Sequence, residues 1–212
     1  MKAERIYAGL MELAANTKLA QEDRHVLASI VAIAAVEAVQ GKSLCDALGM
    51  EGAQLRKFLD ASFPHSSPLF ANLSLSAPIA RSEEEACIRE LLLRFRTRGS
   101  KLAPLLATLV ARRAMRPNHL WQDLGFAHRG ELSAMMSRHF APLATRNRQD
   151  MKWKKFFYRM TCSEEGFSLC CAPVCGECGD FSTCFGDESG ESLLARNQFL
   201  GSTLPLVQVA VV

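Results

Sequence analysis

The chain has 212 residues, of which 49% are hydrophobic and 22% are charged, and its formal net charge is +3. A chain of this length and composition buries a substantial core, which excludes general disorder and predicts one main domain. The first residues include Glu4 and Glu12 and so lack the unbroken apolar stretch of a secretory signal. The most apolar stretch, 26–39, contains Glu37 and is too short to cross a bilayer. We therefore expect a cytoplasmic protein without a membrane segment.

Apolar residues recur at helical spacing through most of the first 162 residues. Gly41 ends the second of the expected helices, and Ser43 is placed to cap a short turn. Three prolines then mark an irregular connector at 63–80, which is the best candidate for an internal boundary. The expected elements of this half are helices over 4–15, 22–40 and 54–63 and a capped turn over 43–48.

The second half continues the helical pattern. Ser82 and Glu85 have the spacing of a capping box, which predicts a helix that begins there. This helix is expected to run to about Arg98, where Gly99 is placed to end it. Pro104 fits the first turn of the following helix. The remaining expected helices cover 102–115, 129–145 and 151–162. The final VQVAVV is the longest alternating pattern, and no internal repeat occurs.

The predicted fold class is therefore all-α: a helical bundle with a cysteine-rich, metal-binding loop near the C-terminus. We divide the chain into a helical domain at 1–162, a cysteine-rich segment at 163–188 and a tail at 189–212. The apolar end of the tail is compatible with docking on the bundle, with pairing as a strand or with a disordered extension.

Six of the eight cysteines lie between Cys162 and Cys184. Four of them form the pattern C-x4-C-x2-C-x5-C, and these four are Cys170, Cys175, Cys178 and Cys184. Thiolates brought together by such short connections repel one another unless a cation or a cluster neutralises them. Small secreted proteins that depend on disulfides are shorter and distribute their cysteines more evenly. The pattern therefore predicts a metal site in a reducing compartment.

The spacing leaves two metals open. Structural zinc commonly binds two C-x2-C pairs that are a dozen or more residues apart, whereas C-x4-C-x2-C is the opening spacing of plant-type iron–sulfur proteins. The spacing favours an iron–sulfur species over zinc. Cys171 adjoins Cys170 and offers an alternative register, and Cys162 is a further candidate ligand or transfer thiol. For both we expect a non-ligand role, because free cysteines are often simply buried.

The charges near the cysteines are segregated. Residues 138–159 hold seven basic residues and one acid, whereas residues 160–195 hold seven acids and no lysine or arginine. Each run is compatible with an ordinary solvated face. Alternatively, the basic run stabilises an anionic thiolate cluster or attracts an oxyanion or an acidic partner.

Two motifs before the cysteines are each open to a functional and to a purely structural interpretation. In MKWKKFFYR at 151–159, either the lysines have an electrostatic function or the aromatic residues pack inward while the lysines face water. His119 is a further candidate metal ligand, but its surroundings also describe a helix start with Asn118 as the cap, which we favour. The other four histidines show no pairing that suggests a site.

These residues together resemble a known family. The run MKWKKFFYR at 151–159, the spacing of the four cysteines and HLWQDLG at 119–125 are similar to the NifQ family of nitrogen fixation. The specific part of the resemblance covers about 119–188. The helical part before it is similar only in length and general character, and the residues after Glu188 have no counterpart.

The resemblance implies a molybdenum carrier rather than an enzyme. Such a protein holds a molybdenum–iron–sulfur cluster, obtains molybdenum from molybdate or another upstream source, and supplies it for the iron–molybdenum cofactor of nitrogenase. Delivery goes to the assembly scaffold NifEN, with the reductase NifH taking part. The implied cluster ligands are Cys170, Cys175, Cys178 and Cys184, with Cys171, Cys162 and His119 as additional candidates.

The alternative is a structural-zinc protein that acts as a nucleic-acid or protein interaction module. The chain lacks base-reading motifs, and the acidic run after the basic one argues against nucleic acid as a partner. A redox role for Cys175 and Cys178 is disfavoured because no βαβ pattern accompanies them. The chain also has no phosphate-binding loop of the G-x-x-x-x-G-K-[ST] type.

Overall fold

The computed structural model describes residues 2–39, 41, 43–75, 77–164, 188 and 190–194. The described part is helical, and no strand occurs in it, which confirms the all-α prediction. In chain order the elements are α1 (Ala3–Ala14), α2 (Gln21–Val39), α3 (Leu44–Leu48), α4 (Gly52–Ser62), the 3-10 helix η1 (Ser67–Phe70), α5 (Glu83–Arg94), α6 (Ala103–Ala114), α7 (Leu120–Asp123), α8 (Arg129–His139), α9 (Ala141–Ala144) and α10 (Trp153–Glu164).

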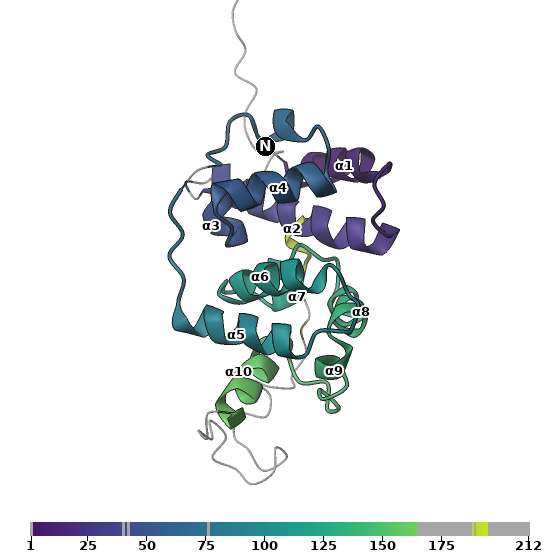
Figure 1. Cartoon of the computed structure of the whole chain (residues 1–212), viewed down its shortest axis with the longest axis vertical. Coiled ribbons are helices and arrows are strands. Elements are labelled where there is room, and N and C mark those ends of the chain that lie inside the picture. Colours follow the sequence, from purple (N-terminus) through teal and green to yellow (C-terminus); the bar gives the residue numbers. More distant parts are fainter. Residues whose placement is uncertain are drawn as a thin grey trace, which may run out of the picture.

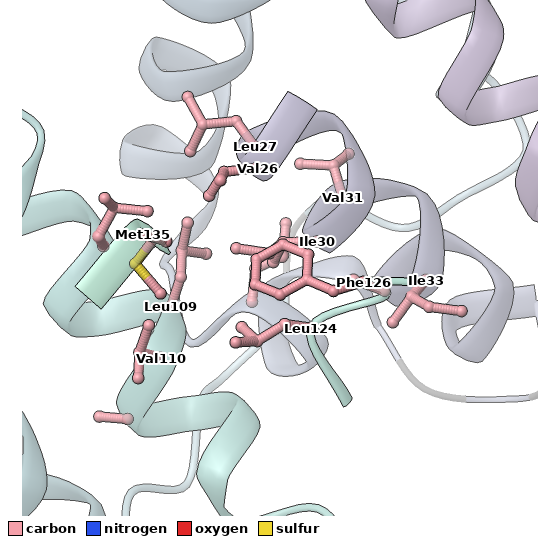
Figure 2. Close-up of a cluster of buried hydrophobic side chains, with 14 of the residues drawn as sticks. Val26, Leu27, Ile30, Val31, Ile33, Leu109, Val110, Leu124, Phe126 and Met135 are labelled. Carbon is pink, nitrogen blue, oxygen red and sulfur yellow. The ribbon is translucent and has the colours of Figure 1, made fainter. Parts of the chain in front are cut away.

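Helix α2 lies at the centre of the hydrophobic core. Every residue from Val26 to Val36 is buried, so this helix is covered on all sides rather than along one stripe. Figure 2 shows its side chains packed against those of α6, α8 and the turn that follows α7. The residues labelled there are Val26, Leu27, Ile30, Val31, Ile33, Leu109, Val110, Leu124, Phe126 and Met135.

The other helices surround α2 in two groups. Helix α1 packs along α2, and α3 contacts both α2 and α6. Helix α5 packs against α6 on one side and α10 on the other. Figure 1 shows α1 and α4 at one end of the molecule and α10 at the opposite end. The helix that leads into the cysteine-rich segment is therefore the one farthest from the N-terminal helices in this view.

Gly125, the last residue of the HLWQDLG motif, allows the turn after α7 to approach α2 closely. Its φ of +77° lies in the left-handed region, which favours glycine. A Cβ at this position would lie 2.7 Å from the backbone oxygen of Ser29. The glycine therefore has a packing function, because it lets Leu124 and Phe126 enter the core beside α2.

Two predicted helix caps are present. The Ser43 hydroxyl accepts a hydrogen bond from Asp46 N at 2.9 Å, and the Ser82 hydroxyl accepts one from Glu85 N at 3.1 Å. The predicted capping box also requires the Glu85 side chain to bond the backbone of Ser82, and this part of the prediction is wrong. The buried Glu85 carboxylate instead faces Arg112, with Oε1 3.3 Å from Nε. Burial raises the pKa of Glu85, and the nearby Arg112 opposes that shift.

Helix α5 ends at Arg94, four residues before the predicted end. The chain turns away because Thr97 bonds with the segment between α8 and α9. Thr97 N donates to His139 O at 2.8 Å, and the Thr97 hydroxyl accepts from Ala141 N at 2.9 Å. Gly99 remains in the turn, with a φ of +85°.

The predicted helix over 129–145 is interrupted. It forms α8 up to His139 and, after Phe140, the short α9. Pro142 explains the break, because it lacks the N–H that a continuous helix would bond and its ring would meet the carbonyl one turn earlier. The predicted apolar face of this segment is confirmed, since Leu132, Met135, Met136 and Phe140 are all buried.

Among the helices that the structure describes, none has the length and apolar character needed to span a membrane.

Candidate functional site

The predicted ligands Cys170, Cys175, Cys178 and Cys184, and the neighbouring Cys171, lie outside the described residues. Cys162 falls within α10. The structure does describe what holds the two flanks of this segment, namely α10 before it and residues 188 and 190–194 after it.

Helix α10 is fixed to the body by its aromatic residues. Trp153, Phe156 and Phe157 are buried, and the Trp153 ring packs against both phenylalanine rings, with centroids 5.8 and 6.0 Å apart. The interpretation that these aromatic residues pack inward is therefore confirmed. Each such side chain contributes on the order of 3–5 kcal/mol to stability when fully buried.

Lys154 in the same run has an internal partner. Its Nζ donates to Asp123 Oδ2 at 2.6 Å and also to the Arg116 carbonyl. Asp123 is buried and also accepts a hydrogen bond from Asn118 Nδ2 at 3.0 Å. Burial lowers the pKa of Lys154, and the ion pair with Asp123 opposes that shift. This lysine joins α10 to α7 and is not available to an oxyanion.

The other basic residues of the 151–159 run are Lys152, Lys155 and Arg159. Lys155 and Arg159 are exposed, and Lys152 is partly buried. Lys152 and Arg159 both take part in interactions within the protein. The run therefore offers fewer lysines that could attract an oxyanion or an acidic partner than its composition indicates.

Glu188, four residues after Cys184, is contacted by the imidazole of His119 and the guanidinium of Arg129. His119 Nδ1 lies 3.3 Å from Oε1, and Arg129 Nη1 lies 3.1 Å from Oε2. The Glu188 side chain is only 7% exposed, so this ion pair is largely shielded from water. His119 thus lies beside the C-terminal flank of the cysteine-rich segment.

Arg129 contacts both flanks of that segment. Besides Glu188, its guanidinium donates through Nη2 to Asp150 O at 2.7 Å and to Met151 O at 3.0 Å, directly before α10. Asp150 has a φ of +53°, an uncommon conformation that the additional 2.8 Å bond between its carboxylate and Arg129 supports. One side chain at the start of α8 therefore fixes the chain before and after the cysteines.

Helix α7 provides a second contact to the returning chain. Gln122 Nε2 donates to Glu191 O at 3.0 Å, while Gln122 Oε1 accepts from His119 N at 3.2 Å. A Cβ at Gly190 would lie 2.7 Å from Gln122 Nε2, so the backbone passes close to this amide. The predicted cap was wrong by one residue, because His119 and not Asn118 is the N-cap of α7. Trp121 and Leu124 of the same motif are buried, as predicted.

A buried ion pair connects α7 to the core. Arg113 on α6 is fully buried and binds Glu37 of α2 through two hydrogen bonds of 2.9 and 2.7 Å. Its Nε also donates to Asp123 O at 2.6 Å. Through Asp123 this contact continues to Lys154 on α10. The α7 region is therefore positioned by charged groups as well as by apolar packing.

Sequence reasoning missed this ion pair, although a signal was present. Glu37 interrupts an apolar helix, and Arg112 and Arg113 follow directly on the apolar run of α6. Charged residues on otherwise buried helices are expected to pair with one another. Two of the remaining histidines, for which no pairing that suggests a site was expected, take part in polar contacts within the body. His25 lies between Tyr7 and Glu131, and His139 lies between Ser100 and Asp23.

Within the described ranges, no group of three or more His, Cys, Asp or Glu side chains is arranged to hold a metal ion. His119 faces Glu188 there, and no second histidine or cysteine joins them in that part of the chain. Any metal role of His119 would therefore depend on ligands from the cysteine-rich segment.

The two tyrosines provide a test of the packing around α10 and α1. Burial, together with Glu84, raises the pKa of Tyr158 from 10.0 to about 12, and burial followed by Glu131 raises that of Tyr7. Because both folded pKa values exceed the unfolded value, this contribution to stability is complete below pH 10.0 and is lost as the pH rises toward 12.

We expect the native protein at pH 10 to show clearly less tyrosinate absorbance than the unfolded chain, which ionises about half of its tyrosine there. Equal absorbance in both states would contradict this burial, and Tyr158→Phe should remove the higher transition.

Comparison with known proteins gives the family. The NifQ family model matches residues 26–186, a range that includes the α7 motif, α10 and all the clustered cysteines. The chain belongs to the NifQ family. NifQ is a family of nitrogen-fixation proteins, and the match extends well beyond the part that the sequence motifs indicated. It ends at Gly186, directly before the residues that contact Arg129 and α7.

Individual relatives agree with the family model. The chain is 40% identical to the "Protein NifQ homolog" of Sinorhizobium fredii (strain NBRC 101917 / NGR234) over 80% of this chain and 74% of that protein. It is 40% identical to "Protein NifQ" of Rhodobacter capsulatus over 66% of this chain and 77% of the relative. It is 46% identical to "Protein NifQ" of Klebsiella pneumoniae over 38% and 48%, respectively. No solved structure matches the chain significantly.

Proposed function

We propose that this NifQ protein carries a molybdenum–iron–sulfur cluster on its cysteine-rich segment and supplies molybdenum for the iron–molybdenum cofactor of nitrogenase. The single observation that carries the proposal is that the family match includes Cys170, Cys175, Cys178 and Cys184. The metal is cargo in this role, and the protein is a carrier rather than an enzyme.

The chemistry of the donor set fits this cargo. Four thiolates suit iron–sulfur species and other soft metals, and a reducing compartment such as the cytoplasm keeps them free of disulfides. We assign the ligands to the four cysteines of the C-x4-C-x2-C-x5-C pattern. Cys171, Cys162 and His119 remain further candidates for a role in loading or transfer.

The helical body supports the proposal by fixing both flanks of the ligand segment. Arg129 binds Asp150 and Met151 on one side and Glu188 on the other, and Gln122 binds Glu191. A ligand segment whose two flanks are fixed to a folded body is suited to a metal that must be bound and later released, because the segment can open locally. We propose that release requires no unfolding of the helical core.

We propose that the partners are those of cofactor assembly. Molybdenum would arrive as molybdate or from another upstream source, and it would leave to the scaffold NifEN with the participation of the reductase NifH. Neither nucleic acid nor a membrane is part of the proposal.

The metal content of the protein tests this function. Protein purified without oxygen from cells supplied with molybdate should be brown and should contain both iron and molybdenum, as measured by plasma mass spectrometry. A thiolate iron–sulfur species accounts for the colour. A colourless protein with one zinc per chain would contradict the carrier role and would support the structural-zinc alternative.

A further inference from the structure

Basic side chains gather on two segments that meet beside α9. The loop between α5 and α6 contributes Arg96, Arg98 and Lys101, and the segment after α9 contributes Arg146 and Arg148. All five side chains are exposed, and neither 94–101 nor 138–149 contains an acidic residue. We call these five residues the basic surface.

Tertiary contacts hold the two segments together. Thr97 N donates to His139 O at 2.8 Å, and the Thr97 hydroxyl accepts from Ala141 N. The Arg146 guanidinium lies 4.4 Å from the centre of the Phe95 ring, which joins the far ends of the two segments. The five basic residues therefore belong to one continuous region of the body and not to two separate loops.

The basic surface lacks carboxylate partners among the residues that the structure describes. Arg96 donates to Leu93 O at 2.9 Å and Arg146 donates to Pro142 O at 2.5 Å, so both are held by backbone carbonyls that do not neutralise them. Some arginines elsewhere in the body bond backbone carbonyls in the same way, as Arg24 and Arg81 do, but each of the following pairs with a carboxylate: Arg112, Arg113, Arg116, Arg129 and Arg138.

This difference has an energetic meaning. Like charges gathered on one surface repel one another and lower the stability of the folded state. The repulsion is relieved when an anionic surface approaches, and such a surface also gains speed of association from the attraction. Arginines held in fixed positions are well suited to carboxylates across an interface.

We propose that the basic surface is the docking face for an acidic surface of a partner protein. The proposal rests on the proposed function, because the partner expected to approach is the protein that receives the molybdenum. In Figure 1, α9 lies in the same half of the molecule as α10, which leads into the cysteine-rich segment. A partner bound there would thus approach the end of the body that carries the cargo.

Nearby charges favour a protein over a nucleic acid. Exposed Glu83, Glu84 and Glu90 lie on α5, which leads directly into the basic surface. A continuous phosphate backbone would be repelled by these carboxylates, whereas a protein can present its acids only where the basic residues lie. The net charge of only +3 also differs from that of a typical nucleic-acid binder.

Charge reversal tests the docking face. The triple variant Arg96→Glu, Arg98→Glu, Lys101→Glu is compared with a control triple, Arg5→Glu, Arg56→Glu, Lys57→Glu. The control residues are exposed on α1 and α4 at the opposite end of the molecule, so the net charge changes equally. Binding of purified NifEN to each immobilised protein is measured by biolayer interferometry at low and at physiological salt.

We expect the wild-type protein to bind more weakly at higher salt, and the basic-surface triple to bind at least about tenfold more weakly than wild type. The control triple should stay within about twofold of wild type, because its charges lie far from the interface. Equal weakening in both triples, unchanged binding in the first, no binding by wild type, or stronger binding to DNA than to NifEN would overturn the proposal.

Two further measurements separate this proposal from the proposed function. Circular dichroism establishes that both triples are folded, and iron and molybdenum are measured in the same preparations. If the wild-type preparation contains no iron or molybdenum but still docks through the basic surface, the result would overturn the carrier function and support the docking face. Metal-loaded wild-type protein that does not bind NifEN would overturn the docking face and leave the carrier function standing.

Discussion

Replacing Arg113 with methionine is expected to lower the free energy of unfolding by about 2–4 kcal/mol, because it removes the charge-assisted hydrogen bonds of a buried guanidinium, while Glu37 keeps a second partner in Arg116. Arg113 is fully buried, and it binds Glu37 through two hydrogen bonds as well as the Asp123 carbonyl. The loss would therefore affect α2, α6 and α7 together. Urea unfolding followed by circular dichroism measures the effect.

Arg89→Met is the matched control for this experiment. Arg89 is exposed on α5 and, within the part of the chain that the structure describes, bonds only the Thr108 hydroxyl, so its replacement should change stability by less than about 0.5 kcal/mol. Adding Glu37→Gln to Arg113→Met should restore part of the loss, because it removes a carboxylate that is then left with Arg116 as its cationic partner. A loss below about 1 kcal/mol for Arg113→Met would show that the pair is accessible to water.

Serine at Cys175 or Cys178 is expected to reduce bound iron and molybdenum below about one tenth of the wild-type content. A hydroxyl does not ionise as a thiol does, and loss of one of four ligands costs more than the roughly tenfold to hundredfold found for outer-shell changes. We expect the helical content of the body to be unchanged, because its core is formed by residues of α1 to α10. Metal analysis and circular dichroism of the same samples measure both quantities.

The neighbouring cysteines make this experiment specific. Cys170→Ser should lose the metals whereas Cys171→Ser should retain them, if the C-x4-C register is the one used. The opposite result would assign the C-x3-C register instead. Cys87→Ser on α5 is the control, because it changes a partly buried thiol outside the cysteine-rich segment. Equal loss in all variants would show that the metals are bound nonspecifically.

Most helices were predictable because their apolar residues recur at helical spacing and their caps are local. Ser43 and Ser82 cap the turns that follow them as local rules require. The end of α5 was predicted wrongly because it depends on Thr97, which bonds residues some forty positions later. The break at Pro142 was readable in principle, but the apolar pattern continued across it and outweighed the proline.

The site was predictable to a smaller extent. The spacing of the cysteines and the MKWKKFFYR run indicated the family, which the comparisons confirmed. The contacts of Arg129 were beyond sequence reasoning, since its partners lie more than twenty and more than fifty residues away and only the tertiary fold brings them together. Lys154 was open to two interpretations for the same reason, because only its position beside the buried Asp123 decides between them.

The two contacts of Arg129 would also affect the thermodynamics of the proposed metal binding. Arg129 joins Met151, directly before α10, to Glu188, so one guanidinium closes the stretch of chain between positions 151 and 188. Bringing together the ends of a chain of this length costs roughly 3 kcal/mol in entropy relative to a very short loop. The folded helical body holds these ends together before any metal binds, so the entropy is already lost at that point. The four thiols are then present at a high effective concentration for one another. Weakening Arg129 would thus reduce metal affinity without changing a single ligand.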